Sequence, residues 1–118
     1  MNHVGNIQPV RAKLQTTDTT ILTGTKERLQ IMAIWLCNTH ASNRTVDLTV
    51  TSDSVDYELL KTFVITGENK EIIQAQGWPV LTLNEGEVLK GLCSGANDDV
   101  HIQIVTTTLG TADIGTPF

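Results

Sequence analysis

Hydrophobic and polar residues alternate along much of this chain with a period of two. In the segments 45–51 and 100–106, every second residue is apolar and most of the others are threonine, aspartate, histidine or glutamine. Successive side chains of a strand point to opposite faces, so each segment predicts a strand with one buried and one wet face. The side chains predicted to point inward are Val46, Leu48, Val50, Val100, Ile102 and Ile104.

Further short apolar segments, each bounded by turn-forming residues, predict an all-β fold. They cover residues 10–14, 20–22, 57–65, 71–74, 80–83 and 87–93. The first two are expected to pair through the polar turn 16–19. Strands repeated at about 8 to 12 residues are typical of a sandwich or barrel. We therefore predict a single antiparallel β-sandwich, jelly-roll-like, of about eight strands over residues 10–108, with arms at 1–9 and 109–118.

The segment from Leu29 to Cys37 is apolar at both odd and even positions. This pattern predicts a central strand covered on both sides, either by a second sheet or by a neighbouring subunit. A buried helix is the competing interpretation, because short apolar runs do not discriminate between the two. Trp35 is expected to lie in the core.

Composition restricts the classes of function. The chain has 118 residues, a mass of 12.9 kDa and a net charge of −5, which suits one domain without the basic surface of a nucleic-acid binder. No apolar stretch approaches the roughly 20 residues of a membrane-spanning helix, and the first residues do not resemble a secretory signal. Synthesis in the cytosol is therefore expected, with no membrane partner. Cys37 and Cys93 are expected to be small buried residues, with a disulfide as the alternative.

One segment permits an enzyme interpretation. Gly91 to Gly95 has the form Gly-x-Cys-x-Gly, which resembles the nucleophile turn of viral chymotrypsin-like cysteine proteases, and His40 and an acid such as Asp56 or Glu58 lie upstream. That fold needs two barrels, whereas this chain can build about one. We therefore predict a protein that is not an enzyme, with no cofactor and no metal site.

The candidate partner-binding residues lie in loops and in the C-terminal arm. A tryptophan in a loop can dock into a partner or stack on a sugar, and an apolar residue in an arm can serve as an anchor. The bland alternatives are a small satellite core, solvated turn residues and frayed ends. The candidates are Trp78, Asn97, Asp98, Asp99, Ile114 and Phe118. His101 is placed on the outer face of its strand.

Several segments resemble the small all-β virion structural proteins of tailed bacteriophages. The resemblance covers roughly residues 17–108 and consists mainly of strand-and-turn patterns, with a turn at 22–26 that replaces the usual Pro-Ala-Gly. The segments are Cys37-Asn38-Thr39, Arg44-Thr45-Val46-Asp47-Leu48-Thr49-Val50, Tyr57-Glu58-Leu59-Leu60-Lys61 and Leu83-Asn84-Glu85-Gly86-Glu87-Val88-Leu89-Lys90.

The resemblance implies a virion component that is assembled in the host cytoplasm. It would be a capsid decoration or cement protein, or a neck or tail accessory protein. Such a protein binds capsid or tail subunits and its own copies as a homo-oligomer. The alternative is a small β-sandwich module that binds a glycan or a host surface through Trp78 and the loop 94–99.

Overall fold

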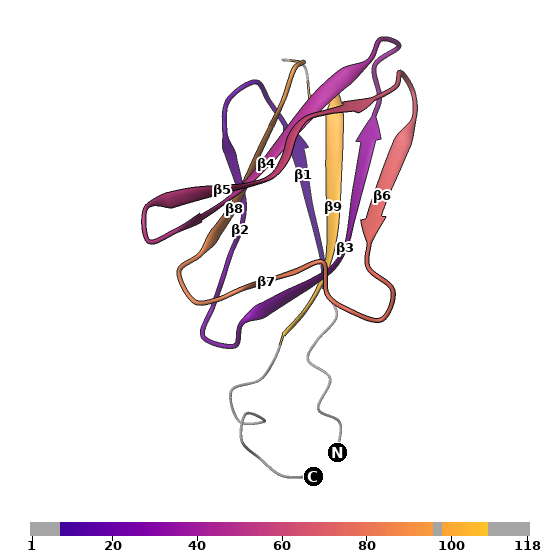
Figure 1. Ribbon diagram of the computed structural model, residues 1–118. Helices are drawn as coiled ribbons and strands as arrows, with labels where there is room; N and C mark the ends of the chain where they lie inside the picture. The colour runs from indigo at the N-terminus through magenta and orange to yellow at the C-terminus, as the bar shows by residue number, and fades with distance from the viewer. Residues whose placement is uncertain (1–7, 96–97, 109–118) are drawn as a thin grey trace.

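The computed structural model describes residues 8–95 and 98–108 and shows an all-β fold (Figure 1). Two antiparallel sheets face each other as the layers of a sandwich, and these two ranges contain nine strands and no helix. The predicted fold class is therefore confirmed. The strands are β1 (Gln8–Leu14), β2 (Thr19–Thr23), β3 (Leu29–Asn38), β4 (Arg44–Ser52), β5 (Val55–Ile65), β6 (Lys70–Gln74), β7 (Leu81–Leu83), β8 (Val88–Cys93) and β9 (Val100–Thr108).

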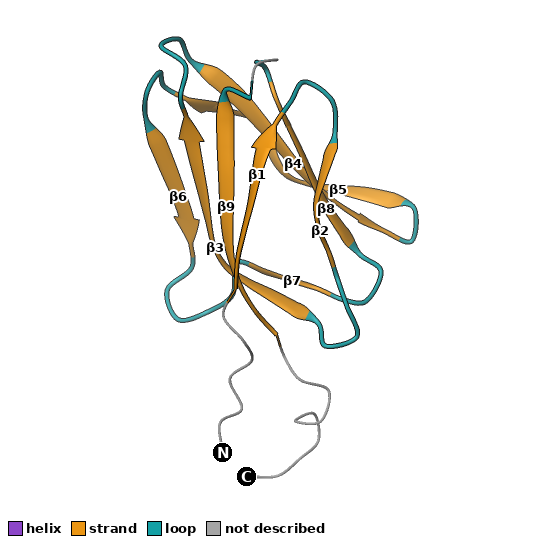
Figure 2. Ribbon diagram, turned by 180° about the vertical axis from the view of Figure 1, so that it is seen from behind, coloured by secondary structure: helices purple, strands orange, loops and turns teal. Residues whose placement is uncertain are grey.

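The chain passes repeatedly from one sheet to the other. Sheet A has the order β1-β9-β3-β6, with β7 also paired to β3, and sheet B has the order β2-β8-β4-β5. Figure 2 shows β1 beside β9 in one layer and β2 beside β8 in the other. The predicted pairing of the first two strands is wrong, because the turn after β1 carries the chain across the sandwich. The jelly-roll path remains a prediction.

The core lies between the sheets and consists of the inward-facing side chains of both. All six side chains that the alternation placed inside are buried. Gly91 lies in the middle of this packing, where a Cβ atom would come within 2.8 Å of Leu48 Cδ2 and 3.0 Å of Ile21 Cδ1. A larger residue in this part of β8 would therefore push the two sheets apart or displace their side chains.

A buried polar side chain ties the two sheets together at one end. Asn38, the last residue of β3, donates its two Nδ2 hydrogens among the carbonyls of Ser42 (2.9 Å), Ile65 (3.0 Å) and Thr66 (3.2 Å). Its Oδ1 accepts the backbone N–H of His40 at 2.9 Å. The turn after β3 is thus bonded to the end of β5 in the opposite sheet, and every polar atom of this buried amide has a partner.

Strand β5 is the edge of sheet B and is exposed along most of its length. Its pairing with β4 contains two register irregularities. At one of them, Thr62 has φ of 53° and donates its N–H to Asp47 Oδ1 at 2.7 Å. Such bulges interrupt the row of backbone donors and acceptors along an edge, which discourages a further strand from adding there.

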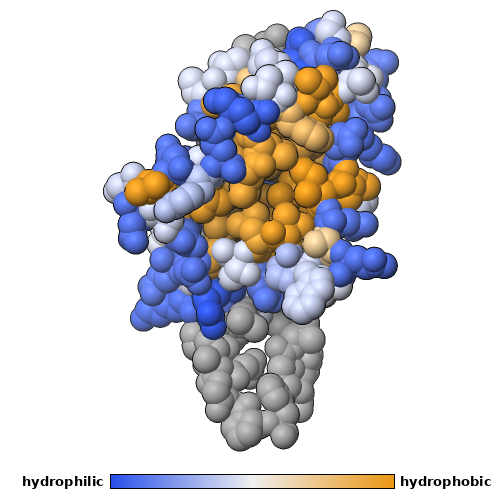
Figure 3. Space-filling model, in the orientation of Figure 1, coloured by the Kyte–Doolittle hydropathy of each residue, from blue (hydrophilic) through white to orange (hydrophobic). Residues whose placement is uncertain are grey.

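Apolar side chains gather in the middle of Figure 3, between β5 and β6 of Figure 1. Leu60 and Phe63 of β5, Ile73 of β6 and Leu81 of β7 are only partly buried against the core. Both sheets end here in an edge strand, so no further strand within residues 8–95 and 98–108 covers the inner side chains. This side of the sandwich is therefore sealed less completely than its centre.

Candidate functional site

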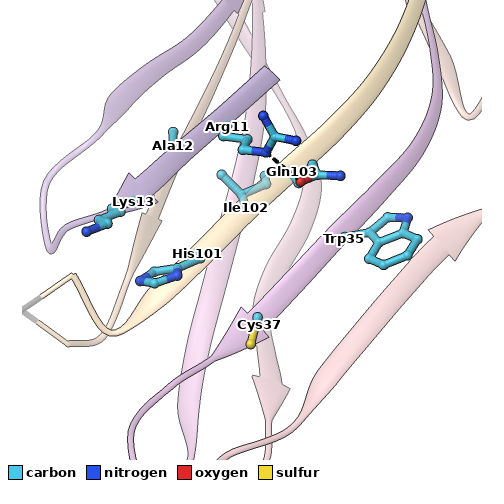
Figure 4. A pocket seen from close by; sticks show the side chains of 8 residues that line it. All are labelled: Arg11, Ala12, Lys13, Trp35, Cys37, His101, Ile102 and Gln103. Carbon is cyan, nitrogen blue, oxygen red and sulfur yellow. Dashed lines mark hydrogen bonds between the residues drawn. The ribbon is translucent and has the colours of Figure 1, made fainter. Parts of the chain in front are cut away.

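A shallow pocket of about 420 Å³ lies on the outer face of sheet A (Figure 4). Strands β1, β9 and β3 each contribute two outward-facing side chains two residues apart. These six are Arg11, Lys13, His101, Gln103, Trp35 and Cys37, and Ala12 and Ile102 complete the lining. Spacing of two residues places each pair on one face of its strand.

Strand register brings the three pairs together in two rows. Arg11 is opposite Gln103, which is opposite Trp35, and Ile72 of β6 follows Trp35. Directly opposite residues of antiparallel strands lie on the same face of the sheet. The second row is Lys13, His101, Cys37 and Lys70. We call these eight side chains the basic face.

Contacts on the basic face leave its apolar groups open to solvent. Arg11 Nε donates to Gln103 Oε1 at 2.8 Å, which holds the guanidinium over β9. Beside this pair, 43% of Trp35 and 42% of Ile72 are exposed. The exposed Trp35 and Ile72 are opposite each other, so they form a small apolar patch on a face that also carries Arg11 and Lys70.

The prediction that Trp35 lies in the core is wrong, and a β-bulge explains why. Pairing of β3 with β9 shifts register between Ile31 and Ala33. The buried positions are therefore odd before the bulge and even after it, where Ile34 and Leu36 point inward. Trp35 must then point outward. Part of the apolar pattern at both parities therefore reflects the bulge, and the described chain does not cover the outer side.

The two cysteines are both free thiols: Cys37 is exposed on β3 of sheet A, and Cys93 is buried on β8 of sheet B. Cys93 is 1% exposed, as predicted, and its Sγ lies 3.1 Å from the carbonyl oxygen of Gly95 and 3.4 Å from that of Leu14. Cys37 is exposed, so its predicted burial is wrong. Cys37 follows Trp35 by two residues in the same strand, so the bulge after Ile31 turns both side chains outward.

The chemistry of the pocket is that of recognition by charge and aromatic stacking. None of the described residues that line it is a carboxylate, so this surface favours anionic or neutral polar groups over cations. Cys37 and His101 are cross-strand partners, but no hydrogen bond joins their side chains. A thiol nucleophile needs a base within hydrogen-bond reach, so this pair lacks the geometry of an activated cysteine.

A second, smaller depression of about 220 Å³ lies on the outer face of sheet B. Four carboxylates, one lysine and two uncharged residues line it, and we call it the acidic face. Its residues are Asp18, Asp47, Thr49, Asp56, Glu58, Lys61 and Leu92. Its ion pairs are long. Lys61 Nζ lies 3.9 Å from Glu58 in an exposed pair, and Nζ of the partly buried Lys90 lies 3.8 Å from Asp56.

The residues of the protease interpretation are engaged in the fold. Cys93 is buried, and its thiol faces backbone carbonyls. His40 Nδ1 accepts the backbone N–H of Ser42 at 2.9 Å. Asp56 belongs to the acidic face and accepts the Thr51 hydroxyl at 2.6 Å. Thr51 lies near the end of β4, whereas His40 lies in the turn before the start of this strand. The structure therefore does not assemble Cys93, His40 and Asp56 as a nucleophile, base and acid.

Of the predicted partner-binding residues, Trp78 is the most accessible. It lies between β6 and β7 and is 72% exposed, which agrees with its predicted place in an open loop. A bridge to Ala75 shapes this loop, in which the Trp78 N–H donates to the Ala75 carbonyl at 3.3 Å. Whether Trp78 binds a partner stays a prediction.

The two described aspartates of the loop before β9 differ in burial. Asp99 is 7% exposed, and its Oδ2 lies 2.9 Å from Arg44 Nε. Its carbonyl accepts the Thr39 N–H at 2.7 Å, so Asp99 is committed to the fold. Asp98 is half-buried with φ of 58°. Asn97, Ile114 and Phe118 lie outside the described residues.

Sequence reasoning missed both outer faces. The available signal was the spacing of two residues in Arg11–Lys13, Trp35–Cys37 and His101–Gln103, which places each pair on one face. Only the pairing of β1, β9 and β3 brings these pairs together, and alternation does not reveal pairing.

No protein-family model and no curated protein matches the chain. Among the described residues, no helix is long and apolar enough to cross a membrane. No group of three or more His, Cys, Asp or Glu side chains in the same ranges is arranged to hold a metal ion.

Proposed function

We propose that the chain is a non-enzymatic structural protein of a bacteriophage particle, which binds capsid or tail subunits and its own copies through the outer faces of its sandwich. The observation that carries the binding role is the uncovered Trp35–Ile72 patch on the basic face. Burying a tryptophan and an isoleucine that already stand on a sheet costs little ordering entropy, which favours binding there. The assignment to a phage particle rests on the strand-and-turn resemblance.

The structure supports an assembling role in a second way. The core is made by inward-facing residues alone, while β3 also carries apolar residues on its other side. Trp35 stays 43% exposed after folding, so much of its apolar area is still open to a partner. If a partner covers Trp35, the function of this residue is binding, and no catalytic step is needed.

Mass spectrometry of density-purified particles, from a phage whose genome carries this sequence, tests the proposal. We expect the chain in multiple copies per particle. Trp35→Ala should remove it from the particles, whereas Trp78→Ala, the matched change at the other exposed tryptophan, should leave its copy number unchanged. Absence of the unmodified chain from the particles would contradict the proposal. Loss with Trp78→Ala alone would move the binding surface to the β6–β7 loop.

A glycan-binding or host-surface-binding module is the second candidate function. Trp35 stands beside the Arg11–Gln103 pair and His101 in the pocket, an arrangement that provides a stacking surface next to hydrogen-bonding groups. For this second function we propose the basic face as the sugar site, in place of Trp78 and the loop 94–99. A glycan array with the isolated protein discriminates: sugar binding that Trp35→Ala abolishes favours this second function.

A further inference from the structure

The two outer faces of the sandwich carry opposite charge. In a chain of net charge −5, the basic face displays Arg11, Lys13 and Lys70, and its pocket has no carboxylate among the lining residues that the structure describes. The acidic face displays four carboxylates around one lining lysine. Sheet A and sheet B are the two layers of one sandwich, so these faces point in opposite directions (Figure 1).

We propose that the basic face of one copy binds the acidic face of the next, so that copies stack head to tail. This inference rests on the proposed function and identifies the first partner as a second copy of this chain. Such a contact is heterologous: every dimer keeps one free basic face and one free acidic face. Addition of further copies then closes a ring or extends a filament.

The residues of the two faces complement each other in type as well as in charge. Trp35 and Ile72 need an apolar surface, and Leu92 lines the acidic depression and offers one. Arg11 and Lys13 need anions. The exposed Lys61–Glu58 pair at 3.9 Å contributes little, so Glu58 remains available to a second chain. Asp56 already accepts the Thr51 hydroxyl and lies 3.8 Å from the partly buried Lys90.

Charge also decides against the symmetric alternative. Two basic faces brought together would place the same cations opposite one another, and like-charge contacts across an interface are unfavourable. A face of four strands about 4.8 Å apart is only about 15–20 Å wide. The area that it can bury is therefore at the small end for stable interfaces. The contact is therefore expected to be reversible and to depend on concentration and salt.

Sedimentation of the full chain at rising concentration provides the test. The mass should rise above 12.9 kDa in about 0.1 M salt and return towards the monomer in about 1 M salt, where the Debye length falls from about 10 Å to about 3 Å. A chain that stays monomeric at low salt and high concentration overturns the inference.

Two double variants separate the faces. Arg11→Glu with Lys13→Glu disables the basic face. Asp18→Asn with Glu58→Gln disables the acidic face without making it basic, so the two altered faces do not attract each other. Each variant alone should be a monomer. An equimolar mixture should give 1:1 complexes of twice the monomer mass and nothing larger, because each variant keeps one intact face.

The controls Lys26→Glu and Glu85→Lys change charge in exposed turns outside both faces and should assemble like the unmodified chain. Circular dichroism and thermal unfolding check that every variant folds. Dimers formed by the acidic-face variant alone would overturn the head-to-tail geometry. So would an equimolar mixture in which no complex forms although both variants are folded.

The outcomes also separate this inference from the proposed function. A monomeric chain that is present in particles, and lost from them with Trp35→Ala, would overturn head-to-tail stacking and leave the particle role standing. A chain that stacks as described but is absent from particles would support the inference and overturn the particle role.

Discussion

Strands β3 and β4 hold equivalent central places in their sheets, yet their outer sides differ. β3 lies between β9 and β6, and β4 lies between β8 and β5. Both bury alternate apolar side chains. The outward residues of β4 are threonines and an aspartate, which water solvates, whereas those of β3 include Trp35 and Cys37. The comparison teaches that two central strands with the same buried pattern can differ outside: β4 shows water only polar side chains, whereas β3 leaves an aromatic side chain exposed.

The largest effect that we expect is a difference in thiol reactivity between the two sides. Cys37 is exposed on β3, whereas Cys93 is buried opposite Val46 of β4. A buried thiol reacts only when the fold opens, so an unfolding free energy of about 5 kcal/mol would slow it about a thousandfold or more. Iodoacetamide at neutral pH should modify one thiol of the native protein.

Peptide mapping of the modified protein should place that label on Cys37. The control is the same reaction in denaturant, where both thiols should react at similar rates. Rapid labelling of Cys93 in the native protein would contradict its burial and would reopen the interpretation of Cys93 as a reactive nucleophile.

The next effect compares inward positions, where β3 and β4 should behave alike. Leu36 and Leu48 are both fully buried. Truncation of either to alanine leaves a cavity as well as removing apolar contacts, at a cost of about 2–5 kcal/mol. Urea unfolding should show a similar loss of stability for both variants. Thr49→Ala, a change on the outward side of β4, should cost less than about 0.5 kcal/mol.

A third prediction tests the outward side of β3 alone. Trp35→Thr gives β3 the residue type that β4 already carries outside, and the free energy of unfolding should change by no more than about 0.5 kcal/mol. Binding at the basic face should be lost, because the exposed apolar area there falls. Urea unfolding and light scattering measure the two effects. A loss of several kcal/mol would show that Trp35 supports the fold itself.

The alternation of residues predicted the inner half of this molecule and little of the outer half. Val46, Leu48 and Val50 could be placed inside, because a strand with one wet face reveals its buried parity directly. Trp35 could not be placed, because the bulge after Ile31 changes the inward parity and leaves no mark in the sequence.

The pairing of the strands could not be predicted either, because alternation does not depend on which strands are neighbours. A hairpin of the first two strands and a crossing between sheets both satisfy the same alternation, so the pairing of β1 with β9 had to come from the structure. Because β1 supplies Arg11 and Lys13, the basic face depends on this pairing. The place of Trp78 in a loop, in contrast, followed from the turn residues around it, but its exposure of 72% had to come from the structure, because a small satellite core fitted the same loop.

The smallest effect concerns the turn between β7 and β8, two strands that pair with β3 and β4. β7 pairs with β3, β8 pairs with β4, and Glu87 lies between them. Its Oε1 accepts the backbone N–H of Asn84 at 2.7 Å. This bond, with a smaller contribution from Ser52, lowers the pKa of Glu87 below its usual value of 4.5.

A carboxyl group whose pKa is lowered by folding stabilises the native state above its unfolded pKa, and this stability is lost as pH falls through the folded pKa. The unmodified protein should therefore lose slightly more stability than Glu87→Gln when the pH is taken from 7 to 3. Parallel unfolding curves of the two proteins at both pH values measure the difference. An equal loss in both would show that the turn between β7 and β8 does not depend on the charge of Glu87. The other carboxylates would then account for the whole acid sensitivity.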